Sequence, residues 1–298
     1  MGDRVMWFNG SVVPWEEARV HVWDESALRG ANVFEGITAF WDAGTGTHHI
    51  LAGPAHVDRL FASAHLADIP TAATRSELWS ALAEVASAHP GSDVYLRPTF
   101  YAVSGRSTLS PNSEGGLYIG GFEFNPTAPP QARAVVSAHR RFGGPIGAMA
   151  KAGGSYLDFR LFERERLKHG VEHVLILNER GNVAEADGAA VLLVGGKSVT
   201  TPSLDSGVLD SITKRIVLDI ARHSGCEVNE RGVHRDELYR GQPLLAGTLM
   251  GLRLLDSVDG NDVDDAAATA TARELAADYE RLCRGHHVLS KVYLTPLT

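Results

Sequence analysis

Hydrophobic and polar residues alternate along the chain with two different spacings, which predict a protein built from both strands and helices. Residues 4–13, RVMWFNGSVV, hold two short apolar runs joined by Asn9-Gly10, a pair suited to a tight hairpin turn. Residues 56–69 and 75–89 carry apolar side chains at the spacing of amphipathic helices, whereas residues 93–103 have the pattern of a strand. We therefore expect an α/β unit in the first part of the chain.

A proline-rich stretch then interrupts the pattern. Residues 124–133, FNPTAPPQAR, contain three of the 13 prolines and show no periodicity, as is typical of a linker. We expect a smaller N-terminal α/β domain over residues 1–125, an interdomain linker over residues 126–134 and a larger C-terminal domain over residues 135–298.

The second half again mixes both spacings. Ser155 and Asp158 have the spacing of a capping box and Gly170 is a typical helix stop, so a helix is expected over residues 155–170. The other elements expected here are a strand at 132–139, several strands within 173–202, and helices at 210–225 and 271–283. The predicted fold class is α/β (α+β) with two domains.

The charge balance narrows the function. The chain has 28 basic and 36 acidic residues, a net charge of -8, which argues against a general binder of nucleic acid or membrane surfaces. Its two cysteines, Cys226 and Cys283, lie far apart without a disulfide or zinc-type spacing, and this fits a reducing cytoplasm. The N-terminus has no signal-peptide layout, and the longest purely apolar run, Ala189–Val194, is too short to span a membrane. We expect a cytoplasmic protein.

Two common chemistries find no support in the motifs. HGVEH, residues 169–173, matches a zinc-peptidase pattern, but Gly170 stands where the helix should end, so His169 and His173 would point apart. The glycines of residues 142–154 lack the G-x-G-x-x-G order of a dinucleotide site. We expect neither a metal site nor a nicotinamide cofactor.

Lys151 invites a chemical interpretation. It is one of five lysines in the chain and stands in AKAGGSYLD, residues 150–158, close to Gly153 and Gly154. A free amine is protonated at neutral pH, so a catalytic lysine must be desolvated or converted into an imine. Small neighbours let another molecule approach the backbone closely, which suits a Schiff-base lysine. A loop lysine with its amine in water is the alternative.

Two segments are candidates for binding an anion. DSITK opens a predicted helix, where the backbone N–H groups of Ile212 and Thr213 and the Thr213 hydroxyl can face an anion. An ordinary cap formed by Asp210 or Ser211 is the alternative. Thr248, in AGTLM, follows an apolar run and is a second candidate donor.

Arg59 and Glu185 complete this set. Arg59, in HVDRL, could add a fixed positive charge, and a surface position is the alternative. Glu185 falls within an expected buried strand, where a carboxylate is costly unless it is paired or bonded to a protonated base. A solvated strand end is the alternative for Glu185. A lysine imine, phosphate donors and a carboxylate for a pyridinium nitrogen are together what pyridoxal phosphate requires.

Seven segments resemble, in their order and spacing, the fold-type IV pyridoxal-phosphate enzymes, and among these most of all the branched-chain amino acid aminotransferase family. They are NVFEGITAF at 32–40, HVDRL at 56–60, YLRP at 95–98, AKAGGSYL at 150–157, NVAEADG at 182–188, SITK at 211–214 and AGT at 246–248. The resemblance covers nearly the whole chain. It implies the two-domain fold of these enzymes, pyridoxal 5'-phosphate as cofactor, and a homodimer or higher homo-oligomer.

The resemblance also implies roles for individual residues. Lys151 would form the imine with the cofactor, Tyr156 would bond its phenolic oxygen, and Glu185 would keep its ring nitrogen protonated. The phosphate would be held by Arg59, Ile212, Thr213 and Thr248, and the substrate side would be lined by Phe34, Tyr95, Arg97, Thr248 and Leu249. The implied reaction exchanges an amino group between an L-amino acid, apolar by default, and a 2-oxo acid.

Three departures from the family pattern bear on substrate and cofactor. Arg29 stands where the family usually has tyrosine, and it could clamp a carboxylate or lie at the surface or an interface. EADGAA, residues 185–190, lacks the polar pair of the usual Glu-Gly-x-Gly-Glu-Asn. LDSITK, residues 209–214, puts Asp210 near the expected phosphate site. The alternatives are a specialised biosynthetic substrate, D-amino acid transamination, aminodeoxychorismate-lyase-like chemistry and a catalytically silent binding protein.

Overall fold

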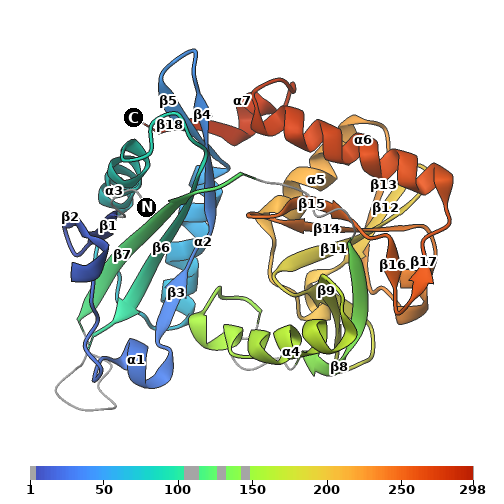
Figure 1. Ribbon diagram of the computed structural model, residues 1–298, viewed down its shortest axis with the longest axis horizontal. Coiled ribbons are helices and arrows are strands. Elements are labelled where there is room, and N and C mark those ends of the chain that lie inside the picture. Colours follow the sequence, from blue (N-terminus) through green and yellow to red (C-terminus); the bar gives the residue numbers. More distant parts are fainter. Residues whose placement is uncertain (1–4, 104–113, 126–131, 142–147, 298) are drawn as a thin grey trace.

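The computed structural model describes residues 5–103, 114–125, 132–141 and 148–297 of the chain. Figure 1 shows two sheets side by side with helices packed around them; strands coloured blue to green build most of one sheet, and strands coloured yellow-green to red build most of the other. We call the first sheet with its helices the first domain, and the second sheet with its helices the second domain.

The first sheet is antiparallel in all its described pairs and runs in the order β18-β5-β4-β6-β7-β1-β2, with β3 paired to β6. Its strands are β1 Val5–Phe8, β2 Ser11–Pro14, β3 Asn32–Phe34, β4 Ile37–Asp42, β5 Thr47–Leu51, β6 Val94–Ala102, β7 Gly115–Glu123 and β18 Leu294–Leu297. The turn between β1 and β2 has positive φ at Asn9, 45°, and at Gly10, 113°. This confirms the predicted hairpin.

Two helices, α2 Gly53–Leu66 and α3 Arg75–Ser87, share a core with this sheet. Their apolar stripes bury Leu60 and Leu82 against strand residues such as Phe100 of β6, and none of these three side chains is exposed to solvent. Side chains alternate along a strand, so the residues of β6 between the core positions face away from this core. A short helix, α1 Glu25–Arg29, precedes β3.

The second sheet is mixed and runs in the order β13-β12-β11-β10-β9-β8-β16-β17, with β14 paired to β11 and β15. Its strands are β8 Arg133–Arg141, β9 His173–Asn178, β10 Val183–Ala186, β11 Ala189–Gly195, β12 Ser198–Pro202, β13 Glu227–Arg231, β14 Gln242–Gly247, β15 Gly251–Leu254, β16 Ser257–Val258 and β17 Asn261–Asp262. Helices α5 Ile212–His223 and α6 Ala266–Cys283 share one core with β11 and β14. The architecture agrees with the predicted α/β (α+β) class.

Helix α4, Phe159–His169, packs on β9 through Phe162 and begins later than the sequence predicts. Residues 153–156 form a separate 3-10 turn, and Asp158 makes no side-chain capping bond, so the predicted capping box at Ser155 is wrong. The helix ends as predicted, with Gly170 in the left-handed region at φ 63°. His169 therefore closes a helix and His173 opens a strand, which confirms that the two histidines of HGVEH stand on different elements.

The C-terminal segment joins the two domains. From α6 the chain passes through α7, Ser290–Tyr293, to β18, which pairs with β5 at the edge of the first sheet (Figure 1). Residues 294–297 were predicted to belong to the C-terminal domain, but they join the sheet of the first domain. The edge of β5 needs a neighbouring strand to satisfy its backbone hydrogen-bonding groups. Residues 126–131 of the predicted linker lie outside the described residues, and Arg133 already belongs to β8.

The described residues contain neither a membrane-spanning helix nor a cluster of metal ligands. No helix there is both long enough and apolar enough to cross a membrane. No group of three or more histidine, cysteine, aspartate or glutamate side chains is placed there to hold a metal ion.

Removal of residues 294–298 is expected to destabilise the protein and to promote aggregation. The truncation uncovers the backbone edge of β5 and removes the buried side chain of Leu297, whose burial alone contributes about 2 kcal/mol. Thermal unfolding followed by light scattering measures the effect, with a chain lacking only Thr298 as control. Equal unfolding temperatures and equal scattering for the two chains would contradict this role of β18.

Candidate active site

Lys151 lies where the two domains meet, two residues before the start of the 3-10 turn Gly153–Tyr156. Its Nζ donates a hydrogen bond to the Tyr156 hydroxyl at 2.8 Å. The Tyr156 ring stacks on Phe159, with centroids 4.5 Å apart, and meets Phe34 of β3 edge-on at 4.8 Å. The structure thus brings Phe34 of the first domain against the lysine and tyrosine of the second.

The glycines beside Lys151 let this segment dock closely on the first domain. A Cβ atom on Gly153 would overlap the side chain of Asn32, and a Cβ on Gly30 would lie 3.4 Å from the Cα of Gly154. The carbonyl of Lys151 accepts the N–H of Phe34 at 3.0 Å. The close approach expected of these glycines therefore comes from within the chain, and docking on β3 favours the 3-10 turn over an earlier start of α4.

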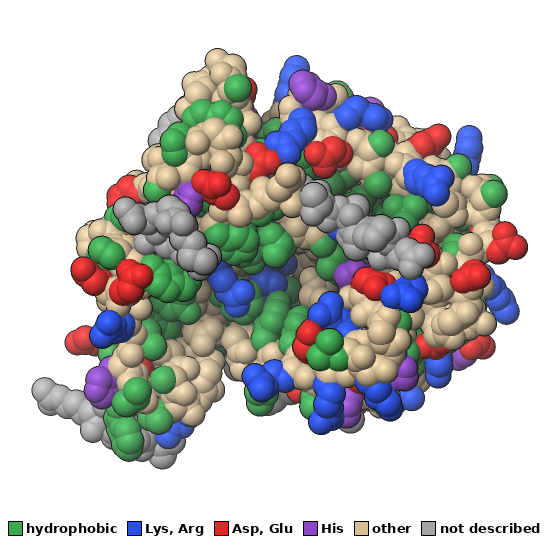
Figure 2. Space-filling view, in the orientation of Figure 1, with side chains coloured by type: hydrophobic (Ala, Val, Ile, Leu, Met, Phe, Trp, Pro, Cys, Tyr) green, Lys and Arg blue, Asp and Glu red, His purple; other side chains and the backbone are tan. Residues whose placement is uncertain are grey.

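A pocket that opens to solvent surrounds the Lys151 amine. Figure 2 shows the molecule hollowed between the two domains, with hydrophobic and basic side chains gathered in the hollow. Of the predicted site residues, six line the pocket: Arg59, Lys151, Tyr156, Glu185, Ile212 and Thr248. Residues far apart in the sequence, from both domains, thus contribute to one site.

Arg59 is held by a buried carboxylate that the sequence analysis did not single out. Glu35, with no exposed surface, accepts hydrogen bonds from Arg59 Nε at 2.6 Å and Arg59 Nη2 at 2.8 Å. Its second partner is His56 Nδ1, at 2.7 Å, so this ring nitrogen carries the proton. The bidentate pair fixes the guanidinium plane of Arg59 at the pocket wall.

The pKa values of this cluster follow from burial and charge. Burial alone would raise the pKa of the Glu35 carboxyl, but the charge and hydrogen bonds of Arg59, with those of His56, outweigh it and lower this pKa to about 2. Burial lowers the pKa of His56 against the opposing pull of Glu35. The cluster at neutral pH is therefore a carboxylate, a guanidinium and a neutral imidazole.

The N-terminus of α5 presents free backbone donors to the same pocket. The N-cap residue Ser211 uses its hydroxyl to accept the N–H of Lys214 at 3.1 Å. In the described part of the chain, the N–H groups of Ile212 and Thr213 have no hydrogen-bond acceptor. The cap that the sequence analysis kept as an alternative is present, and it leaves these two donors for an anion.

The side chains of Asp210 and Thr213, which were expected near an anion, contact other residues instead. The Asp210 carboxylate, half-exposed, pairs with Arg215 at 3.2 Å, while its backbone carbonyl accepts Arg59 Nη1 at 2.6 Å. Thr213 is buried but does not line the pocket, and its hydroxyl contacts the phenol of Tyr279 on α6. The backbone of this segment therefore serves the pocket, whereas the two side chains face other partners.

Glu185, on β10, lines the same pocket as Arg59. Arg141, at the end of β8, donates a hydrogen bond to one carboxylate oxygen, and the N–H of Leu209 lies 3.5 Å from the other. Burial raises the pKa of Glu185, and the charge of Arg141 opposes that rise. Glu185 is thus the paired, mostly buried carboxylate that its place in a strand requires.

Asp187 holds the altered loop after Glu185 to β9 through two hydrogen bonds. Its carboxylate accepts the N–H of Val174 at 3.2 Å, and its own N–H donates to the Val174 carbonyl at 3.0 Å. Ala189 and Ala190, which replace the usual polar pair, open β11 and line the pocket. The change makes the wall more apolar while leaving Glu185 in place.

The remaining predicted residues lie around the pocket or away from it. The Arg97 guanidinium stands 3.9 Å over the Phe34 ring, and Tyr95 packs on Phe122 with centroids 5.0 Å apart. Arg29 is half-exposed and forms an ion pair with Glu25 at 2.6 Å. Leu249 is exposed and its side chain does not line the pocket.

Four ionisable residues of the site were not predicted from the sequence: Glu35, His56, Arg141 and Lys214. Glu35 had a signal, because a carboxylate inside the apolar run VFEGI needs a partner for the same reason as Glu185. Lys214 also lines the pocket, but its Nζ is bonded to Glu230 at 3.1 Å. Arg141 had no signal, since its pairing depends on β8 and β10 flanking β9 in the sheet.

Comparison with known proteins agrees with this geometry. The family model described as amino-transferase class IV matches residues 32–258, which include the three segments that carry Arg59, Lys151 and Glu185. The chain belongs to the class IV aminotransferases. It is therefore a transaminase that depends on pyridoxal phosphate, as the resemblance predicted.

Individual relatives support the same family over the full length. The probable branched-chain-amino-acid aminotransferase of Aquifex aeolicus is 28% identical over 97% of this chain and 96% of its own. The branched-chain-amino-acid aminotransferase of Escherichia coli is 28% identical over 94% of this chain and 93% of its own. A Thermoproteus uzoniensis branched-chain aminotransferase solved with norvaline has a TM-score of 0.91 at 28% identity over 100% of both chains. The T.th. branched-chain amino acid aminotransferase complexed with N-(5'-phosphopyridoxyl)-L-glutamate has a TM-score of 0.92 at 27% identity, again over 100% of both chains.

The residues present fit pyridoxal phosphate. The pocket offers a guanidinium and two free backbone N–H groups for a phosphate, from Arg59 and the start of α5. It also offers the Glu185 carboxylate for a ring nitrogen, and the Lys151 amine lies in the same wall beside a tyrosine hydroxyl. This donor set supplies each group that the cofactor needs.

Replacing Glu35 by glutamine is expected to cost about 3 kcal/mol of folding stability at pH 7, because it leaves the Arg59 guanidinium partly buried without its counter-charge. Since the Glu35 pKa falls from 4.5 to about 2 on folding, the ion pair stabilises the wild type above pH 4.5 and is lost as the pH falls toward 2. Urea unfolding at several pH values measures this, with the exposed Glu84→Gln as control. If Glu35→Gln were as stable as Glu84→Gln at pH 7, the Glu35–Arg59 ion pair would not contribute to folding stability as described.

Proposed function

We propose that this transaminase exchanges amino groups between L-amino acids with apolar side chains and 2-oxo acids, with Lys151 as its catalytic residue. The observation that carries the proposal is the Lys151 amine, 2.8 Å from the Tyr156 hydroxyl, in a pocket that also presents Arg59, the start of α5 and Glu185. The branched-chain names of the relatives and the norvaline and L-glutamate groups of the similar structures support the substrate class. The alanines of the pocket wall suit an apolar side chain as well.

Each residue has a part that follows from its chemistry. Bound pyridoxal phosphate supplies an electron-withdrawing ring that makes the Cα–H of an amino acid acidic. The Lys151 Nζ would take the proton from that Cα as a general base and would deliver it, as an acid, to a second carbon atom. Tyr156, whose hydroxyl lies beside the Lys151 amine, would donate a hydrogen bond to the phenolic oxygen of the cofactor, and Glu185, oriented by Arg141, would accept the hydrogen bond of the ring N–H.

The phosphate is assigned to Arg59, Thr248 and the backbone N–H groups of Ile212 and Thr213. Arg59 and the start of α5 both contribute positive potential, since the helix dipole favours an anion at its N-terminus. We keep Thr213 in this set through its N–H group, because its hydroxyl faces Tyr279. The half-exposed Asp210 carboxylate pairs with Arg215 and does not line the pocket, so it does not oppose the phosphate from within.

The substrate side is assigned to Phe34, Tyr95, Arg97 and the backbone of Leu249. Arg97 has no carboxylate partner among the described residues, and it stands over the Phe34 ring that contacts Tyr156. A guanidinium in that position suits a substrate carboxylate. Arg29 is assigned to the surface or to a subunit interface, because its guanidinium is already paired with Glu25 and half-exposed.

We further propose that the protein forms a homodimer and works in the cytoplasm. Several large apolar side chains are exposed near the pocket and α1, among them Trp23, Leu28, Met149 and Leu157. Exposed apolar residues mark a protein contact when they lie together as one patch, and the close approach of Gly30 to Gly154 places the end of α1 beside the Lys151 segment. Free thiols at Cys226 and Cys283 support a reducing compartment.

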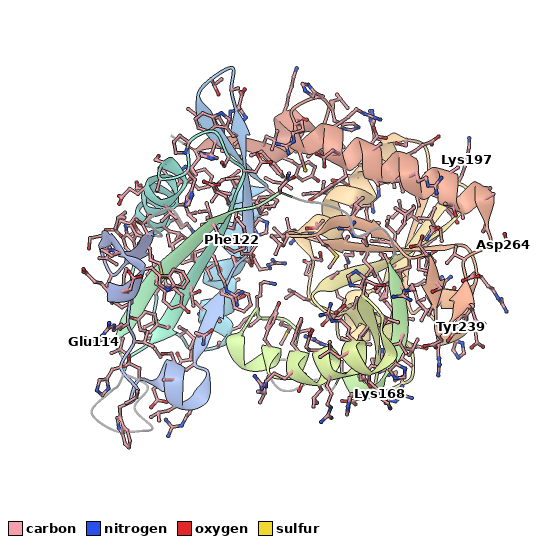
Figure 3. All side chains as sticks on the ribbon, in the orientation of Figure 1. Glu114, Phe122, Lys168, Lys197, Tyr239 and Asp264 are labelled. Carbon is pink, nitrogen blue, oxygen red and sulfur yellow. The ribbon has the colours of Figure 1, made fainter. Side chains whose placement is uncertain are left out.

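The cofactor assignment predicts a visible absorbance band that depends on Lys151. Purified protein incubated with pyridoxal phosphate is expected to gain a band that borohydride removes, and Lys151→Ala is expected to lack it. Lys168→Ala, at the edge of the second domain in Figure 3, is the matched lysine control and should keep the band. A colourless wild type would instead favour the catalytically silent homologue, and pyruvate release without an amino acceptor would favour the lyase.

If Arg97 binds the substrate carboxylate, Arg97→Gln is expected to bind the amino acid more weakly. The KM for the amino acid is expected to rise about tenfold or more, because a charge-assisted bond to the substrate carboxylate is lost. Arg75→Gln is the control, since Arg75 also stands over an aromatic ring, at 4.7 Å from the Phe61 centroid, but lies on α3. Steady-state kinetics with L-leucine and D-leucine measure both the effect and the stereochemistry. Equal KM values in the two variants would remove Arg97 from the substrate site.

A further inference from the structure

Ser63 is a buried residue whose hydroxyl contacts the backbone of the catalytic lysine. It lies on α2 with no exposed surface, and its Oγ accepts the N–H of Lys151 at 3.1 Å. No other described residue accepts this N–H group. The bond crosses between the domains, from a helix of the first to the reactive segment of the second.

The other backbone group of Lys151 is held by the first domain as well. Its carbonyl accepts the N–H of Phe34 at 3.0 Å, and the next residue, Ala152, forms an isolated antiparallel bridge with Val33. The Nζ bond to Tyr156, by contrast, lies within the second domain. The first domain therefore fixes where the lysine side chain starts.

The same two elements of the first domain also orient Arg59. Ser63 follows Arg59 by four residues, so the two side chains lie on one face of α2. Arg59 is bonded to Glu35, which follows Phe34 directly. The contacts close a ring that runs from Lys151 through Ser63 and Arg59 to Glu35 and back through Phe34.

We propose that Ser63 is a positioning residue that sets the place of Lys151 relative to Arg59, and so relative to the phosphate end of the pocket. This inference rests on the proposed function for its catalytic consequence. An amine that must reach one carbon to take a proton and another to return it loses efficiency when its anchoring backbone moves. Ser63 itself does not line the pocket.

A merely structural role for Ser63 makes a different prediction. A buried serine that only completes a core would lower stability when replaced, with no selective effect on the lysine. A positioning residue changes the lysine segment and the turnover number while leaving substrate affinity nearly unchanged. The comparison therefore needs a second buried helix serine, and Ser290 of α7 serves, because its hydroxyl bonds the Leu282 carbonyl at 3.0 Å outside the pocket wall.

The experiment compares Ser63→Ala, Ser63→Cys and Ser290→Ala with the wild type. Amide hydrogen exchange at Lys151, measured without added cofactor, is expected to be about tenfold faster in Ser63→Ala and unchanged in Ser290→Ala. With pyridoxal phosphate added, kcat is expected to fall about five- to tenfold with KM within about twofold. Ser63→Cys should fall between, because sulfur is a weak acceptor.

The outcomes separate this inference from the proposed function. Unchanged exchange at Lys151 in Ser63→Ala overturns the inference, whether or not the wild type is active. Faster exchange with a kcat equal to that of Ser290→Ala also overturns it, leaving Ser63 a structural residue. If the wild type neither binds pyridoxal phosphate nor transaminates, the proposed function fails, and with it the effect of Ser63 on turnover.

Discussion

A fully buried carboxylate, Glu35, determines how the two domains form one pocket. An unpaired charge in the interior of a protein costs several kcal/mol, so this side chain must find partners wherever the fold places it. It finds them in Arg59 and His56, both on α2, and the pairing ties β3 to that helix. The remaining donor of Arg59 reaches the carbonyl of Asp210 at 2.6 Å, in the second domain. Satisfying one buried charge thus orients a pocket arginine and joins the domains.

The position of Lys151 follows from the same constraint. Both polar groups of its backbone are bonded by β3 and α2, the two elements that Glu35 holds together. The amine end of the pocket and its anion-binding end therefore share one frame of reference. Close docking of this segment requires a small residue at position 153, because a Cβ atom on Gly153 would overlap the side chain of Asn32. Catalysis by proton transfer depends on such fixed distances.

Much of this could be predicted from the sequence, because the signals were local. Periodicity gave the hairpin, α2, α3, α5 and α6, and the motifs placed Lys151, Glu185 and Arg59 in one site before any geometry was known. Local sequence signals failed where a contact between distant parts of the chain determines the start or the position of an element. The late start of α4 follows from docking on β3, and β18 leaves the second domain to cover an edge strand.

The sequence also did not predict the directions in which several side chains point. The sequence offered the Thr213 hydroxyl as an anion donor, but packing of α5 on α6 turns it toward Tyr279, and only the backbone N–H remains. Arg29 occupies a position expected near the pocket, yet the helical spacing to Glu25 gives it a nearer partner. Arg141 meets Glu185 because of strand order in the second sheet, which no motif encodes.

The most direct test of the account is to find which lysine holds the cofactor. The protein is incubated with pyridoxal phosphate, reduced with borohydride, digested and mapped by mass spectrometry. The account predicts the reduced cofactor on Lys151 alone among the five lysines. The informative competitor is Lys214, which lines the same pocket but is bonded to Glu230 at 3.1 Å. A label on Lys214, or one spread over surface lysines, would contradict the assignment of Lys151 as the catalytic residue.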